Sequence, residues 1–406
     1  MGLEQAINFD DLRRLAKRRL PKIAFDFIEG GVDGEEGLVH NTSAFSRQRL
    51  VPKYMVDASK PDQSTTLFGR TYASPVGIAP TGAAAFFRAG ADLMLAHAAR
   101  DANIPFIISG ASTASIEDIA AIAPEHAWYQ LYMSRDRTIA DDMVARVEKA
   151  GLSTLVLTVD VPGAVNRERN RRNGFTRAPK PTLATKIEAL THPSWLLEYA
   201  TSPALTGSNW IKYAPPGASA TEVLDFLAHQ HPTPATWDDV ARIRKLWPRN
   251  FVIKGIMQPS DAVRATAMGV DGVIISNHGA RQLDRAPSPI EVLPAIRDAA
   301  GDKLTLMLDS GIQRGSDVVT TLCHGVRFAF VGRWTLYGVA AGGQAGAHHA
   351  VRMIRDEIGS VMCQIGAPNV QNLGPDFLMW PAVQARPGHE PTRPRPAALA
   401  AVNVSG

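Results

Sequence analysis

The sequence predicts an α/β fold, a closed (β/α)₈ TIM barrel with an N-terminal helical extension and a long loop insertion after strand 4. Eight short apolar runs alternate with eight helical patterns from residue 76 onward. Continuous apolar runs of this length are typical of parallel strands that are buried on both faces. Each run also ends in polar or charged residues, as barrel strands do where they reach an active site.

The elements follow in chain order. The predicted strands cover residues 76–80, 104–109, 128–132, 154–160, 251–255, 272–276, 304–309 and 328–332. The predicted helices cover residues 91–100, 115–122, 137–150, 236–246, 259–268, 289–299, 315–322 and 336–358. Thr236, directly before Trp237, Asp238 and Asp239, is typical of a helix N-cap.

Three segments lie outside the repeat. Residues 1–75 predict a helical cap of two or three short helices, with a hairpin between residues 50–56 and 65–68, that plugs the bottom of the barrel. Residues 161–235 form an insertion far longer than the usual βα loop, which predicts a lid or binding element. The barrel domain is expected to span residues 76–380, followed by a flexible tail at 381–406 that is rich in Pro and Ala.

Composition excludes several classes of protein. A content of 45% hydrophobic and 20% charged residues is that of a folded chain. Two cysteines, Cys323 and Cys363, exclude a disulfide scaffold and a multi-cysteine metal site, and no metal is predicted. The net charge of +4 is too small to indicate a nucleic-acid partner. Without a signal peptide or a long apolar run, we expect a cytoplasmic protein.

Common catalytic motifs are missing from the sequence. No Gly-x-Gly-x-x-Gly follows a strand, and neither a phosphate loop nor a Gly-x-Ser-x-Gly elbow occurs, so a Rossmann dehydrogenase, a P-loop enzyme and a serine hydrolase are disfavoured. The pairs His229/His231 and His348/His349 have no further metal ligands near them. We interpret these four histidines as surface residues.

The loop after the sixth predicted strand carries the most informative motif, Ser-Asn-His-Gly-Ala-Arg-Gln at residues 276–282. His278 can accept a proton near neutral pH. Arg281 can bind a carboxylate through two parallel hydrogen bonds. A base therefore lies beside an anion clamp.

The last two loops of a barrel commonly bind phosphate, and here they contain residues 309–315 and the pair Gly332–Arg333.

Together with residues 80–82, 129–132, 158–160 and Lys254–Gly255, these motifs resemble the FMN-dependent (S)-2-hydroxy-acid oxidase and dehydrogenase family, in order over about residues 8–380. The mandelate dehydrogenase branch of that family also shares residues 19–22, 27–31 and 334–338. The resemblance implies FMN as cofactor, a small-molecule 2-hydroxy acid as substrate and a homotetramer. It leaves the electron acceptor open among quinone, cytochrome and oxygen.

The resemblance also implies roles for individual residues. His278 would be the base, Asp160 its partner, Arg281 and Arg167 the carboxylate clamp, and Tyr132 a ligand of the substrate. Lys254 would lie beside the flavin, where its charge stabilises the reduced ring. The remaining cofactor-binding residues would be Pro80, Thr81, Gly82, Ser109, Gln130, Thr158, Ser276, Asp309, Gly311, Gly332 and Arg333.

The sequence departs from the family pattern in three places. Phe27 replaces a Tyr that usually touches the substrate carboxylate, a loss of about 1 kcal/mol for one hydrogen bond. Gln313 replaces an Arg that contacts the FMN phosphate, so Arg333 and the loop N–H groups are expected to bind more of it. Ala111 and Ala164 replace bulky side chains, which predicts a pocket for a large or aromatic, mandelate-like acid.

Three alternatives stay open at this point. Phe27 is compatible with an oxidase that acts on a larger biosynthetic intermediate. A flavin-free lyase or isomerase could use Lys254 as a Schiff-base amine, and a catalytically inactive barrel could serve as a binding module. The aromatic and basic residues of the insertion also fit a membrane headgroup region as well as they fit a lid. We therefore expect peripheral contact with the inner face of the membrane at most.

Overall fold

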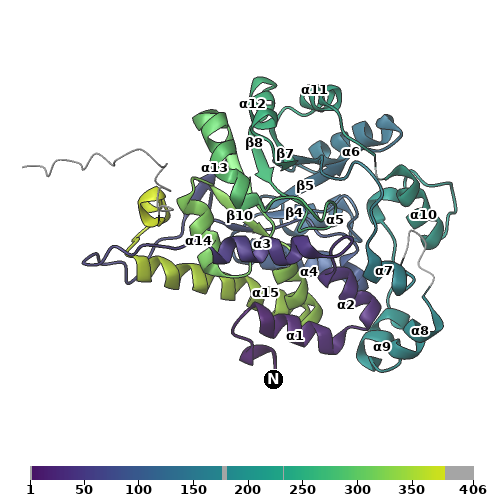
Figure 1. Ribbon diagram of the computed structural model, residues 1–406. Helices are drawn as coiled ribbons and strands as arrows, with labels where there is room; N and C mark the ends of the chain where they lie inside the picture. Colours follow the sequence, from purple (N-terminus) through teal and green to yellow (C-terminus); the bar gives the residue numbers. More distant parts are fainter. Residues whose placement is uncertain (1, 176–180, 232, 380–406) are drawn as a thin grey trace, which may run out of the picture.

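The structure is a computed structural model that describes residues 2–175, 181–231 and 233–379. Its eight parallel strands close into a barrel in the order β10-β3-β4-β5-β6-β7-β8-β9 (Figure 1). The strands are β3 (Val76–Ile78), β4 (Phe106–Ile108), β5 (Ala127–Tyr132), β6 (Thr154–Thr158), β7 (Asn250–Ile256), β8 (Gly272–Ile275), β9 (Thr305–Leu308) and β10 (Phe328–Val331). Each strand coincides with one predicted apolar run, which confirms the (β/α)₈ barrel.

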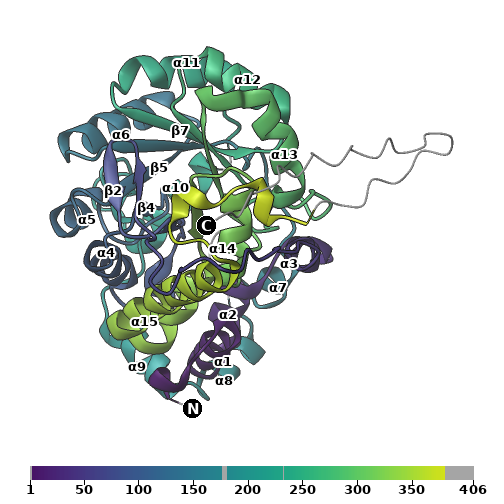
Figure 2. The same ribbon diagram turned by 90° about the vertical axis from the view of Figure 1, so that its left-hand side faces the viewer.

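A ring of helices surrounds the strands (Figure 2). These are α4 (Ala91–Asp101), α5 (Ile116–Ile122), α6 (Arg137–Lys149), α11 (Trp237–Leu246), α12 (Pro259–Ala267), α13 (Pro289–Ala300), α14 (Gly315–Cys323) and α15 (Arg333–Ile365). Thr236 caps α11, because its hydroxyl accepts the N–H of Asp239 at 3.3 Å while the Asp239 carboxylate accepts the N–H of Thr236 at 3.0 Å. Helix α15 exceeds its predicted length and contains one non-helical residue, Gly343.

Alternate strand residues fill the barrel interior, as the period of a β-strand requires. The inward-facing side chains form a single buried cluster of Ala79, Ile107, Trp128, Val156, Val252, Ile274, Met307, Phe328 and Phe330. The residues between them, such as Ile253 and Leu155, belong to the larger core that includes the surrounding helices. The barrel therefore has a packed centre and leaves its polar strand ends to form the site.

A hairpin of β1 (Thr65–Leu67) and β2 (Arg70–Tyr72) joins this interior cluster. Its Phe68 ring lies 5.8 Å from the ring of Trp128, so the hairpin closes the N-terminal end of the barrel. The predicted pairing of residues 50–56 with 65–68 is wrong. Val51 and Lys53 instead donate backbone hydrogen bonds to Phe377 and Ile365 near the C-terminal end of the described chain.

The first three helices, α1 (Phe9–Arg19), α2 (Lys22–Glu29) and α3 (Glu36–Ser46), reach the loops at the opposite, C-terminal end of the barrel. Asn41 on α3 and Asn277 after β8 exchange two side-chain hydrogen bonds of 3.0 and 2.7 Å. Residues 1–75 were expected at the bottom of the barrel. The observed β1–β2 hairpin lies there, whereas α2 and α3 lie at the opposite end, so the expectation is wrong for these two helices. The domain division at residues 75 and 380 stays a prediction, and residues 381–406 lie outside the described part of the chain.

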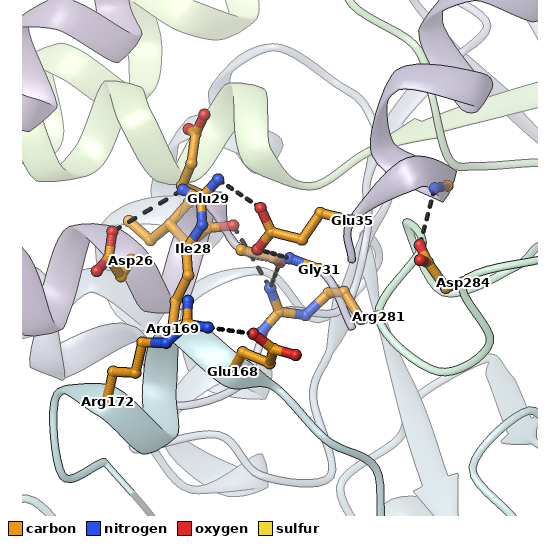
Figure 3. Close-up of polar contacts among 12 residues, drawn as sticks. Asp26, Ile28, Glu29, Gly31, Glu35, Glu168, Arg169, Arg172, Arg281 and Asp284 are labelled. Carbon is orange, nitrogen blue, oxygen red and sulfur yellow. Dashed lines mark hydrogen bonds and ion pairs between the residues drawn. The ribbon is translucent and has the colours of Figure 1, made fainter. Parts of the chain in front are cut away.

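The insertion after β6 contains α7 (Glu168–Arg172), α8 (Leu183–Ala189), α9 (Pro193–Thr201) and α10 (Ala220–Gln230). Helices α7 and α8 pack against α2, where Arg169 forms ion pairs with Glu35 and, at 3.9 Å, with Asp26 (Figure 3). Short 3₁₀ helices cover Leu3–Gln5, Ala84–Phe86, Ser208–Trp210, Gly301–Lys303, Val370–Asn372 and Pro375–Phe377. In the described ranges no helix has the length and apolar character needed to cross a membrane.

Candidate active site

The C-terminal ends of all eight barrel strands contribute to one cavity of about 930 Å³. Most of the predicted site residues line it: Phe27, Pro80, Thr81, Gly82, Ser109, Ala111, Tyr132, Ala164, Arg167, Lys254, His278, Arg281, Asp309, Gly311, Gly332 and Arg333. The other four, Gln130, Thr158, Asp160 and Ser276, do not line the cavity. Three of them bond directly to lining residues: Gln130 to Ser109, Asp160 to His278 and Ser276 to Lys254. Thr158 bonds to Gln130. The barrel thus brings the whole predicted set together.

The centre of the site is a contact between a histidine and an aspartate. Nδ1 of His278 lies 2.8 Å from Oδ1 of Asp160. Burial, together with the charges of Lys254 and Arg167, lowers the pKa of His278 below its usual value in spite of Asp160. Burial alone raises the pKa of Asp160, but His278 and Lys254 more than reverse that effect. These surroundings favour a neutral imidazole at His278 and an ionised carboxylate at Asp160.

Lys254 lies buried beside this dyad. Its Nζ is 2.7 Å from Oγ of Ser276, 3.1 Å from Oδ2 of Asp309 and 3.6 Å from Oδ2 of Asp160. Burial by itself lowers the pKa of Lys254, but the two carboxylates raise it above the ordinary value. An amine that stays protonated is a poor Schiff-base nucleophile. This geometry disfavours the alternative of a flavin-free lyase.

Gly255 makes room for this arrangement. Its φ of +106° lies in a region that side chains rarely adopt, and a Cβ there would lie 2.6 Å from Cβ of Asp160. The pairing of β7 with β8 also shifts register between Lys254 and Ile256. Only glycine therefore lets the carboxylate of Asp160 approach the strand that carries Lys254.

Three partly buried arginines line the same cavity as His278. Arg281 donates to the carbonyl of Gly30 at 2.7 Å, with its guanidinium 5.2 Å from the ring centre of Phe27. Arg333 donates to the carbonyls of Ile28 and Gly279 at 3.0 and 3.1 Å. Arg167 donates weakly to the Arg281 carbonyl at 3.4 Å.

Burial lowers the pKa of each of these arginines. None of the three forms an ion pair with a carboxylate of the described chain, although the other cations of the structure commonly do. Partly buried cations in a cavity, without protein counter-ions, are suited to anionic ligands. The cavity is therefore built for carboxylate or phosphate groups.

Neutral hydrogen-bonding groups lie on the cavity wall at Ser109 and Thr81 and directly behind it at Gln130 and Thr158. The side-chain amide of Gln130 donates from Nε2 to Oγ1 of Thr158 at 2.9 Å. Its Oε1 accepts from the hydroxyl of Ser109 and from the N–H of Gly110, both at 3.3 Å. Oγ1 of Thr81 is buried on the cavity wall without a partner among the described residues. At Gly82 a Cβ would lie 3.1 Å from Cβ of Ala111.

These features fit FMN. The planar, polar edge of its ring system suits the hydroxyls of Ser109 and of the unpaired Thr81, which line the cavity, and Gln130 supports Ser109 from behind. The lack of a side chain at Gly82 suits a ring that lies close to the backbone. The partly buried Arg333 suits its phosphate. Among the described residues, no three His, Cys, Asp or Glu side chains are grouped to hold a metal ion.

The expectation that Arg333 and loop N–H groups bind the FMN phosphate stays a prediction, and hydrogen bonds at the start of α14 restrict which N–H groups are available. The N–H groups of Gln313 and Arg314 both donate to Asp317 at 2.9 Å, and that of Gly315 donates to Glu357 at 2.7 Å. Carboxylates at the start of α14 therefore satisfy these three amides, which are not free for a phosphate. The expectation for the phosphate therefore narrows to Arg333 and the N–H groups around Gly311.

Two histidines interpreted as surface residues are partly or wholly buried. His231 lines the cavity, with its ring 5.4 Å from that of Tyr132 and 5.0 Å from that of Trp210, and burial lowers its pKa to about 4. His349 is buried and hydrogen-bonds to the carbonyl of Ala6 at 2.8 Å. His348 bonds to the Asp101 carboxylate at 2.9 Å.

The sequence did not reveal the apolar side of the cavity either. It is lined by Phe175, Leu205, Leu224, Leu227 and Ala228, all from the insertion. Nothing in the local pattern of these residues distinguishes cavity positions from ordinary core positions. They line the same cavity as Tyr132 only because the path of the insertion brings them there.

The comparisons with known proteins agree with this geometry. Residues 16–380 match the model of the FMN-dependent dehydrogenase family. The chain is 36% identical to (S)-mandelate dehydrogenase of Pseudomonas putida, over 92% of this chain and 94% of that protein. It is 35% identical to an L-lactate dehydrogenase of Caulobacter vibrioides, over 91% and 96% of the two chains.

The solved structures give the same result. A crystal structure of a protein described as monotopic membrane protein (S)-mandelate dehydrogenase superimposes with a TM-score of 0.88 at 36% identity, covering 92% of this chain and 99% of that one. A structure of mandelate oxidase with (S)-2-phenylpropionate gives a TM-score of 0.77 at 32% identity, covering 92% and 98%. The chain belongs to the FMN-dependent dehydrogenase family of 2-hydroxy-acid oxidoreductases, and FMN is its cofactor.

Proposed function

We propose that this enzyme oxidises an (S)-2-hydroxy acid with a bulky, aromatic side chain to the corresponding 2-oxo acid. The contact of 2.8 Å between His278 and Asp160 carries the proposal, because it supplies a neutral base inside a cavity that also contains Arg281 and Arg167. A base beside two partly buried cations is what a hydroxy carboxylate requires.

The roles of the residues follow from their chemistry. Arg281 and Arg167 bind the substrate carboxylate, and Tyr132 hydrogen-bonds to the carboxylate or the hydroxyl. His278, with Nδ1 engaged by Asp160, accepts a substrate proton at Nε2. Asp160 then stabilises the imidazolium and keeps the ring in place. His278 is the base whether the α-hydrogen leaves as a proton or as a hydride.

FMN, when bound, accepts the two electrons that the substrate loses. Pro80, Thr81, Gly82, Ser109, Gln130 and Thr158 would hold its ring system, and Asp309, Gly311, Gly332 and Arg333 its ribityl and phosphate groups. The ammonium group of Lys254 would place a positive charge beside the ring. Ser276 orients Lys254 through their hydrogen bond of 2.7 Å.

The shape of the cavity supports an aromatic substrate. Ala111 and Ala164 leave space on one side, and Phe27 contributes an apolar surface. The wall continues through Phe175, whose ring lies 4.9 Å from that of Phe27, to Leu224 and Leu227 on α10. This extension also favours a second candidate, a larger biosynthetic hydroxy acid whose apolar part reaches α10.

An anaerobic substrate screen tests the proposal. The FMN-loaded enzyme is mixed with (S)-mandelate, (S)-lactate, glycolate and longer aromatic 2-hydroxy acids while the flavin absorbance is followed. We expect rapid bleaching with (S)-mandelate and formation of the 2-oxo acid. A fully loaded enzyme that none of these acids reduces would refute it. Reoxidation by oxygen, a quinone analogue or cytochrome c then identifies the electron acceptor.

We also propose that the enzyme makes peripheral contact with the inner face of the cytoplasmic membrane. Leu183 and Ile187 lie one turn apart on α8, and both are exposed, as are Leu190 and Leu197 nearby. Lys186 on the same helix and Arg171 and Arg172 on α7 supply positive charge. The family resemblance further implies a homotetramer, which light scattering coupled to size-exclusion chromatography tests.

A further inference from the structure

The backbone around His278 is in an unusual conformation. His278, Gly279 and Ala280 have φ values of +58°, +65° and +59°, a region in which residues other than glycine are strained. Ser310, in the loop after the neighbouring strand β9, has a φ of +77°. Strain of this kind persists only where the surrounding structure holds it in place.

Side-chain oxygens hold the three residues after Asn277. The N–H of His278 donates to Ser276 at 3.0 Å, and that of Ala280 donates to Oδ1 of Asn277 at 3.2 Å. The N–H of Gly279 donates to Oγ of Ser310 at 2.8 Å. The first two acceptors belong to the same loop, whereas Ser310 ties that loop to the end of a different strand.

The hydroxyl of Ser310 also donates to Oδ1 of Asp309 at 2.8 Å. The other oxygen of Asp309 lies 3.1 Å from Nζ of Lys254, which lies 3.6 Å from Asp160. Asp160 returns to the imidazole of His278 at 2.8 Å. Ser310 therefore closes a ring of polar contacts that leaves the backbone beside His278 and comes back to its side chain.

We infer that Ser310 is a positioning residue for the base. Its hydroxyl accepts the Gly279 N–H and so fixes the peptide that follows His278. It also donates to Asp309, which weakens the pairing of Asp309 with Lys254 and leaves Lys254 better able to neutralise Asp160. This inference rests on the proposed role of His278 as base. Without the hydroxyl, Asp309 pairs more strongly with Lys254, Asp160 is less neutralised, and the imidazolium form of His278 is favoured.

The test compares two variants that both lack the hydroxyl. Ser310→Ala keeps a strained residue, and Ser310→Gly removes the strain. We expect both to slow anaerobic flavin reduction by roughly ten- to hundredfold and to move the acid limb of its pH profile to higher pH. The groups that face His278 and set this limb are Asp160, Lys254 and Arg167. Ser310→Asn, which tolerates positive φ and offers both a donor and an acceptor, should restore part of the rate.

Ser112→Ala is the matched control. Ser112 is buried, and its hydroxyl, like that of Ser310, donates one hydrogen bond and accepts one, here with Ala114 at 2.9 and 3.1 Å. It should lower the melting temperature without moving the pH profile. FMN content, measured from the flavin absorbance of each purified variant, shows that the rates compare equally loaded enzymes.

Hydrogen exchange separates the two levels of the argument. In the FMN-loaded enzyme, the Gly279 amide should exchange faster in both hydroxyl-deletion variants than in the wild type. Wild-type exchange together with a wild-type pH profile in Ser310→Gly would overturn the inference, even if Ser310→Ala fails to fold. If His278→Asn reduces flavin at the wild-type rate, the proposed base is wrong, while faster Gly279 exchange would still establish the tie between the two loops.

Discussion

Nδ1 of His278 lies 2.8 Å from Oδ1 of Asp160, although the two residues are 118 positions apart in the chain. Each follows a barrel strand, β6 for Asp160 and β8 for His278, and β7 between them carries Lys254. The dyad therefore depends on the side-by-side pairing of β6, β7 and β8 and on no local motif. Its consequences can be measured one residue at a time.

The His278→Asn variant should keep its yellow colour and lose its reactivity. The side chain accepts a proton in the reaction but is not needed to hold FMN, so flavin reduction by (S)-mandelate should slow by about 10³-fold or more. Stopped-flow absorbance under anaerobic conditions measures the rate. Reduction at the wild-type rate would show that another group is the base.

The pH dependence of the wild-type enzyme follows from the lowered pKa of His278. The base is active when it is unprotonated, so the rate falls as the pH drops through its pKa. Because burial lowers that pKa, we expect the midpoint of the acid limb of kcat/KM to lie below the pH of about 6.5 that is typical of a free histidine. A midpoint above that value would mean that Asp160 dominates over burial.

Arg281→Lys tests the carboxylate clamp. Lysine keeps the charge but loses the planar pair of donors, so KM should rise strongly and flavin reduction should slow as well. Arg285→Lys is a suitable control, because Arg285 is exposed on the same loop and pairs with Glu36 at 3.2 Å. An unchanged steady-state profile in Arg281→Lys would assign the carboxylate to Arg167 alone.

The strands and the residues at their ends could be predicted because each signal is local. A buried strand appears as a run of apolar residues, and the side chains that follow it must reach the same end of the barrel. The position of α2 and α3 could not be predicted in this way, since Asn41 meets Asn277 only through tertiary packing. For the same reason His231 was interpreted as a surface residue although it contacts Tyr132.

Ala111→Trp should reverse the substrate preference. Ala111 lines the cavity next to Gly82, and an indole there fills the space expected for an aromatic side chain. Since each buried methylene contributes about 0.8 kcal/mol, the wild type should prefer (S)-mandelate over glycolate by more than tenfold, and the variant should favour glycolate. The ratio of the two kcat/KM values measures the change. A wild type that prefers glycolate would contradict the proposed pocket.

The last prediction concerns the exposed apolar face of α8. Leu183 and Ile187 are 74% and 58% exposed, and one buried leucine or isoleucine contributes roughly 1.5–3 kcal/mol. Replacing both by Asp should therefore reduce binding to vesicles that contain anionic lipid by roughly a hundredfold or more, as measured by co-sedimentation. Val39→Asp, at an equally exposed position on α3, should have no effect. Binding of the wild type should weaken as salt rises, because the basic residues of α7 and α8 act through charge. A wild-type enzyme that stays in the supernatant at both low and high salt would leave the insertion with the function of a lid alone.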